Sequence, residues 1–124
     1  MKKTLLPILL ASVWISISEF FRNSLLLHEH WVVHYQKLGI LFPESPVNGI
    51  IWGIWSICFA CVIFMLSKKY SLLQTTLFSW FIGFGLMWIV LANLSVLPFA
   101  ILPLAIPLSV FESFVASYCM YKFK

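Results

Sequence analysis

Three ionisable side chains that could do chemistry inside a membrane fall within long apolar runs of the sequence: Glu19, Arg22 and Glu112. A charged residue at the centre of a membrane-spanning helix costs about 2.5–3.5 kcal/mol, so it is usually kept for binding, transport or pairing. Arg22 follows Glu19 by three residues, close to one helical turn, so the two can form an ion pair. Glu112 lies past the middle of a separate run, and we expect it to be too deep to reach Arg22.

Polar residues form a stripe along the run that contains Glu19. The stripe consists of residues spaced by four, three and four positions: Ser12, Ser16, Glu19 and Asn23. This spacing places them on one face of a helix. A face of this polarity cannot contact acyl chains, so we expect it to face the bundle interior or water.

Asparagine side chains extend the candidate site. Asn93 ends a later apolar run, where it either lines the same outer vestibule as Asn23 or caps its own helix. The residues that we expect to bind a ligand are Glu19, Arg22, Asn23, Asn93 and Glu112.

Three histidines, His28, His30 and His34, lie between the first two apolar runs. His30 and His34 are four residues apart, so on a helix they could chelate one metal ion. The zincin motif requires a Glu directly after the first His and a second His three residues later, and no pair here satisfies it. Histidines in an interfacial loop are more often polar surface residues, so we expect no metal and no other cofactor.

Cys58 and Cys61 match the Cys-x-x-Cys spacing that membrane thiol oxidoreductases use. Those enzymes hold the pair at the outer surface and have further cysteines in their outer loops. Here the pair lies in the middle of an apolar run, and the expected outer loops contain no cysteine. We therefore interpret both residues, together with Cys119, as small buried apolar side chains.

The composition indicates a membrane protein. Of the 124 residues, 62% are hydrophobic and 10% are charged, whereas soluble domains are about half apolar and a quarter charged. A soluble domain of this size could not bury so much apolar surface. The net charge of +4 comes from basic residues at the ends of apolar runs, without the basic face that a nucleic acid requires. The expected partner is the lipid bilayer.

Four apolar runs are long enough to cross a bilayer, which takes about 20 residues. They cover about 4–23, 46–66, 72–93 and 99–121, with a long outer loop at 24–45, so residues 1–124 form a single transmembrane domain. Ser45 and Pro46 are typical of an N-cap and a first helical position, and they predict where the second helix begins.

Lysines lie at the start, between the second and third runs, and at the end: Lys2, Lys3, Lys68, Lys69, Lys122 and Lys124. Basic residues mark cytoplasmic flanks, so both termini are expected in the cytoplasm. The predicted fold is an all-α integral membrane protein, an antiparallel four-helix transmembrane bundle in the plasma (inner) membrane of a bacterium.

The first run also resembles a signal peptide. Its basic start and apolar stretch end in Ser16 and Ser18, a small-x-small pair in front of Glu19. Cleavage there would leave three spans. Apolar residues resume directly after Glu19, so we expect an uncleaved helix.

Small residues recur at helical spacing in the later runs, where membrane helices pack closely. They are Gly49 and Gly53, Ser79 and Gly83, and Ser109, Ser113 and Ser117.

Three classes of function fit these features, in this order. The first is binding or transport of a small solute or lipid-like molecule through a polar cavity lined by the first and fourth spans. The second is a non-catalytic accessory or assembly subunit, which packs as a homo-oligomer or against a partner membrane protein. The third is a membrane-embedded enzyme that acts near the outer interface.

Overall fold

Four long apolar helices dominate the computed structural model, which describes residues 2–123. Each is long and apolar enough to cross a membrane: Lys2–Leu26, Pro46–Ser67, Leu72–Asn93 and Phe99–Phe123. No strand occurs within 2–123. The prediction of an all-helical chain with four apolar spans is confirmed, and the first helix continues three residues beyond its expected end.

Three of the four spans change helical type along their length, and a further short helix joins the first two spans. In chain order the elements are α1 (Lys2–Glu19), the π-helix η1 (Phe20–Leu26), α2 (His28–Lys37), α3 (Pro46–Ser67), α4 (Leu72–Trp80), the π-helix η2 (Phe81–Gly85), α5 (Leu86–Asn93), the 3-10 turn η3 (Phe99–Ile101) and α6 (Leu102–Phe123).

The starts of α3 and α4 follow from their capping residues. α3 begins at Pro46 after Ser45, as expected, and the backbone N–H of Ser45 donates to Asn48 Oδ1 at 3.0 Å. Ser71 caps α4 in the same way, because its backbone N–H donates to Gln74 Oε1 at 3.1 Å; in addition, its Oγ accepts from the backbone N–H of Gln74 at 3.2 Å. These bonds satisfy donors that the first helical turn leaves free.

The segment expected to be a long outer loop contains helix α2. Its aromatic residues explain why it folds: Trp31 and Tyr35 lie one turn apart, and both pack on Phe42, with ring centroids 5.9 and 5.1 Å away. The helix ends before Gly39, whose φ of +77° is easily adopted only by glycine. Polarity alone did not indicate this helix, because its stability comes from the aromatic contact with a residue beyond its end.

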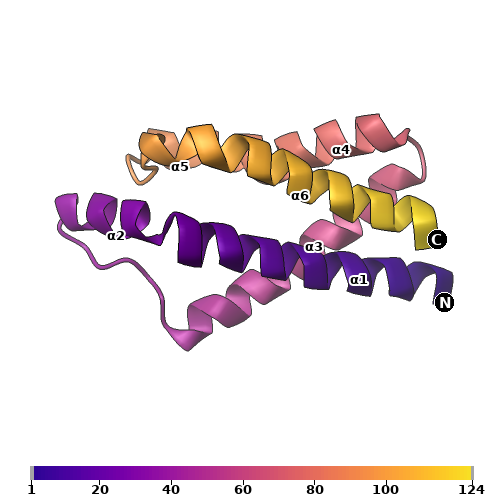
Figure 1. Ribbon diagram of the computed structural model, residues 1–124, viewed down its shortest axis with the longest axis horizontal. Coiled ribbons are helices and arrows are strands. Elements are labelled where there is room, and N and C mark those ends of the chain that lie inside the picture. Colours follow the sequence, from indigo (N-terminus) through magenta and orange to yellow (C-terminus); the bar gives the residue numbers. More distant parts are fainter. Residues whose placement is uncertain (1, 124) are drawn as a thin grey trace.

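α6 lies between α1 and the α4–α5 span, while α3 packs against α1, α4 and α6. Figure 1 shows that α1 and α6 run in opposite directions, and that both ends of the chain and the start of α4 lie at the same end of the molecule. Small side chains allow α1, α3 and α6 to approach closely, because Ala11, Ala60 and Ala116 are fully buried. Gly49 and Gly53, by contrast, face open space within the chain, so their predicted role in packing the bundle is wrong.

Candidate functional site: a buried charged triad

One guanidinium joins two carboxylates between α1 and α6. Arg22 Nη2 donates to Glu19 Oε1 at 2.6 Å, and Nη1 donates to Glu112 Oε1 at 3.1 Å. The exposed fractions of the three residues are 6% for Glu19, 3% for Arg22 and 0% for Glu112, so water barely reaches them. We call Glu19, Arg22 and Glu112 the charged triad.

The expectation that Glu112 cannot reach Arg22 is wrong, and side-chain direction explains why. In an α-helix, side chains lean toward the N-terminal end of their own helix. α1 and α6 run in opposite directions (Figure 1). Side chains that lean toward the N-terminal ends of these two helices therefore lean toward each other, which brings Arg22 and Glu112 together. The long aliphatic stem of Arg22 provides the remaining reach.

Asn23 and two tryptophans hold the triad in place. Asn23 Nδ2 donates to Glu19 Oε2 at 3.0 Å, and Asn23 Oδ1 accepts from Trp31 Nε1 of α2 at 3.2 Å. Trp14 Nε1 donates to the backbone carbonyl of Glu112 at 2.9 Å, which ties α1 to α6 beside the triad. Asn23 thus connects the triad to the short helix outside the span.

The triad is unbalanced in charge and in hydrogen bonding. Two carboxylates face one guanidinium, so the ionised triad carries one net negative charge. Glu112 Oε2 is buried and has no hydrogen-bond partner among the described residues. A buried polar atom without a partner costs about 1–3 kcal/mol, and more if it is charged. A purely structural ion pair would not need this surplus carboxylate.

Both π-helical segments meet at the triad. Arg22 belongs to η1, and its Cζ atom lies 5.1 Å from the ring centroid of Phe84, a fully buried residue of η2. This distance allows a cation–π interaction, worth about 2 kcal/mol where water is excluded. π-helical turns are rare and are often found at functional sites.

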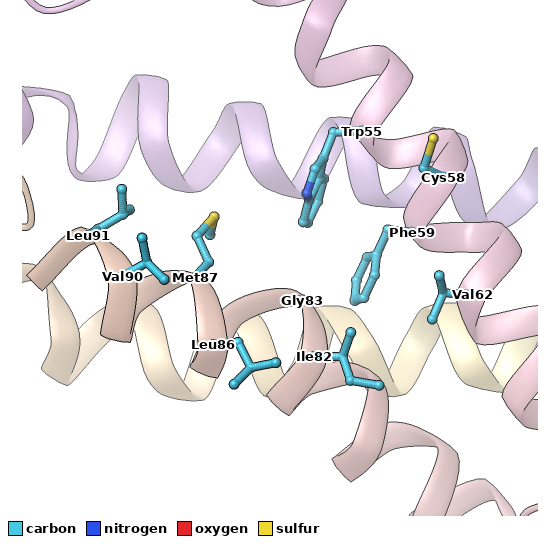
Figure 2. Close-up of a pocket in the computed structure, with 10 residues that line it drawn as sticks. All are labelled: Trp55, Cys58, Phe59, Val62, Ile82, Gly83, Leu86, Met87, Val90 and Leu91. Atoms are coloured by element: carbon cyan, nitrogen blue, oxygen red, sulfur yellow. The ribbon is translucent and has the colours of Figure 1, made fainter. Parts of the chain in front are cut away.

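An apolar groove of about 480 Å³ lies between α3 and the η2–α5 segment. Figure 2 shows side chains of both elements around it, among them Trp55, Phe59, Ile82 and Met87. The rings of Trp55 and Phe59 also pack on Phe84, with centroids 5.8 and 5.6 Å away. Phe84 therefore contacts both the aromatic lining of the groove and Arg22 of the charged triad.

Gly83 sets the width of this groove. A Cβ at Gly83 would lie 2.5 Å from Phe59 Cε1, so only glycine lets η2 approach α3 this closely.

The groove also corrects the interpretation of one cysteine, because Cys58 is exposed and lines it, while Cys61 and Cys119 are partly buried. All three are free thiols.

The other predicted ligand-binding and metal-binding residues lie outside the triad. Asn93 is exposed at the end of α5 and takes part in none of the hydrogen bonds described for the triad. His34 Nε2 lies 2.9 Å from the carbonyl oxygen of Ser95, and His28 Nε2 lies 2.8 Å from Glu44 Oε2. Within residues 2–123, no three His, Cys, Asp or Glu side chains are placed to hold a metal ion.

Sequence reasoning missed Phe84, Trp14 and Trp31, which belong to three different elements. Nothing in their spacing links them to Glu19, because their contacts arise only when the helices pack. The chain matches no protein family model, no curated protein and no solved structure. Its function is therefore argued from geometry and chemistry.

Proposed function

We propose that the four apolar helices form an antiparallel bundle across the plasma (inner) membrane of a bacterium, with both termini in the cytoplasm. The lysines support this orientation. The start of α1, the turn between α3 and α4 and the end of α6 lie at one end of the molecule (Figure 1), and these segments contain Lys2, Lys3, Lys68, Lys69 and Lys122. A cysteine introduced at either terminus should react with membrane-impermeant reagents from the cytoplasmic side. A cysteine introduced in 38–44 should react from the opposite side. Labelling of both from the same side would contradict the orientation.

Within this bundle, the protein binds or transports a small solute or lipid-like molecule, with the charged triad as the polar part of the site. The observation that carries this proposal is the unpartnered Oε2 of Glu112 in a buried triad that holds two carboxyl groups for one guanidinium. A carboxylate in this state is suited to a cation or a hydrogen-bond donor on the solute. Asn23 supplies an amide beside Glu19 for the same purpose.

The apolar groove fits the rest of such a molecule. Its volume of about 480 Å³ lies within the range of about 300–1,000 Å³ that is typical of small-molecule sites. Trp55 and Phe59, which line the groove, pack on Phe84, and the Phe84 ring contacts Arg22 of the triad. A shift of the π-helical turn η2 would move Phe84 and open the triad to the groove, so we expect solute binding to involve this segment.

The test is a thermal-unfolding screen of the purified protein in lipid nanodiscs against lipophilic cations, neutral amphiphiles and anions. A ligand at 100 times its Kd stabilises the folded state by about 2.7 kcal/mol, which a screen detects easily. We expect lipophilic cations to raise the Tm of the wild type, and Glu112→Gln to weaken this response at least about tenfold in affinity. Glu29→Gln is the matched control, because Glu29 is exposed on α2 and should leave the response unchanged.

Two results would overturn this proposal. One is the absence of any response across the panel, together with purification as a stoichiometric complex with another membrane protein, which is the behaviour of an accessory or assembly subunit. The other is an equal response in the wild type and in Glu112→Gln.

A further inference from the structure

Two serines of α6 differ from the other buried hydroxyl residues of the described chain. Ser113 and Ser117 are both 0% exposed, and neither Oγ has a hydrogen-bond partner among residues 2–123. The other buried serines and threonines each bond to a backbone carbonyl or, for one threonine, to a tyrosine: Ser12, Ser56, Ser67, Thr75, Thr76, Ser79 and Ser109. A buried serine in a helix normally donates a hydrogen bond to a backbone carbonyl of the preceding turn, so the two exceptions require another partner.

These two serines continue directly from the unpartnered oxygen of Glu112. Ser113 follows Glu112, and Ser117 lies one turn further on, about 6 Å along the helix axis. One water molecule that bonds to two hydroxyls spans at most about 5.6 Å, because each such bond is about 2.8 Å long. The spacing of Ser113 and Ser117 along the helix is therefore close to the longest span of one bridging water molecule.

The same face of α6 reaches the lysine-flanked end of the bundle at Tyr121, one turn beyond Ser117. The hydroxyl oxygens of Tyr121 and Thr75 are 3.2 Å apart, and Tyr121 also donates to the carbonyl oxygen of Tyr70. Tyr70 lies in the α3–α4 turn, directly after Lys69. A row of polar groups thus runs from the charged triad to this end of the molecule.

We propose that this row holds water and carries protons between Glu112 and the lysine-flanked end of the bundle. Each water or hydroxyl oxygen accepts one proton and releases another to its neighbour, so the proton delivered to Glu112 is replaced from the bulk. The ionisable groups that face Glu112 are Glu19 and Arg22 on the first span, and α4 contributes only hydroxyl groups to the row. This proton route rests on the proposed function, because the route lets the charge of the triad change when a solute binds.

Arg22 provides a specific probe of this route, because it is the only arginine in the sequence. With ¹⁵N-arginine labelling, the guanidinium NMR signals therefore come from Arg22 alone. The guanidinium protons exchange for deuterium only if water reaches the triad. We compare the wild type with the double variant Ser113→Ala/Ser117→Ala. Water leaves the row in this variant because a buried water needs at least two polar partners.

We expect the double variant to slow the exchange of the Arg22 guanidinium protons at least about tenfold. The matched control is Ser56→Ala/Ser79→Ala, which removes two buried serines that bond to their own helix backbone and should leave the exchange rate unchanged. Equal rates in the wild type and in both double variants would overturn the route, because water would then reach Arg22 from the other end.

A second measurement uses the unchanged chain, so it does not depend on the folding of a variant. In NMR spectra, we expect magnetisation transfer from water to the side chains of Ser113 and Ser117. The same transfer should be weak for the side chains of Ser56 and Ser79. No transfer to Ser113 or Ser117 would overturn the proposal. Neither measurement contains a solute, so water at these serines together with a failed solute screen would support the route and reject the solute-binding function.

Discussion

Replacing Arg22 by methionine leaves two buried carboxylates without their shared partner. Arg22 makes ion pairs of 2.6 and 3.1 Å and lies over the Phe84 ring, and it is 3% exposed. Removal of one member of a buried ion pair typically lowers the free energy of unfolding by about 3–5 kcal/mol, because the remaining charge stays buried and unpaired. We expect Arg22→Met to lower it by this amount.

Glutamine at Glu112 should have a much smaller effect on stability. The amide oxygen of glutamine can still accept from Arg22 Nη1, and the triad then holds one carboxyl group for one guanidinium. We expect the free energy of unfolding of Glu112→Gln to stay within about 1 kcal/mol of the wild type. The triple variant Glu19→Gln/Arg22→Met/Glu112→Gln buries no charge and should recover most of the stability that Arg22→Met loses.

Equilibrium unfolding in mixed micelles, followed by tryptophan fluorescence and far-UV circular dichroism, gives the free energy of unfolding of the wild type and of the three variants. Gel filtration in mild detergent shows whether each variant starts from a folded monodisperse state. A decrease of less than about 1 kcal/mol in the free energy of unfolding of Arg22→Met would refute the reasoning, because removing the cation of a buried ion pair should destabilise the protein more than this. A triple variant no more stable than Arg22→Met would refute it as well.

Two further predictions concern the groove and the short helix α2. Gly83→Ala places a Cβ 2.5 Å from Phe59 Cε1, so overpacking of about 1–3 kcal/mol should outweigh the gain in helix propensity of at most about 1 kcal/mol. Its control, Gly53→Ala, meets nothing within 4 Å and should raise the free energy of unfolding in the same titration; destabilisation in both would contradict the packing at Phe59. His34→Ala removes the contact with the carbonyl of Ser95, so amide hydrogen exchange in α2 should accelerate while the global free energy of unfolding changes by less than about 1 kcal/mol. Unchanged exchange in α2 would show that this contact does not hold the helix.

Features that depend on one stretch of sequence could be predicted from it. The four apolar helices and the start of α3 at Pro46 are examples, because span length, apolar content and capping are local properties. The burial of Glu19 also followed, since a polar stripe has to avoid acyl chains.

Features that depend on neighbouring helices could not be predicted. The pairing of Arg22 with Glu112 requires two antiparallel helices whose side chains lean toward each other, and spacing within one run does not contain this information. The contact of Arg22 with Phe84 also depends on two π-helical turns, for which the sequence offers no simple signal. The apolar groove has the same origin, because Gly83 and Phe59 meet only after α3 packs on η2.

The most direct test of the triad as a binding site measures stability and solute response of Glu112→Gln in the same nanodisc preparation as the wild type. We predict a free energy of unfolding within about 1 kcal/mol of the wild type and a solute-induced rise in Tm that is lost or at least about tenfold weaker in apparent affinity. A variant that is several kcal/mol less stable but keeps the full solute response would contradict this prediction, because Glu112 would then be a structural residue only.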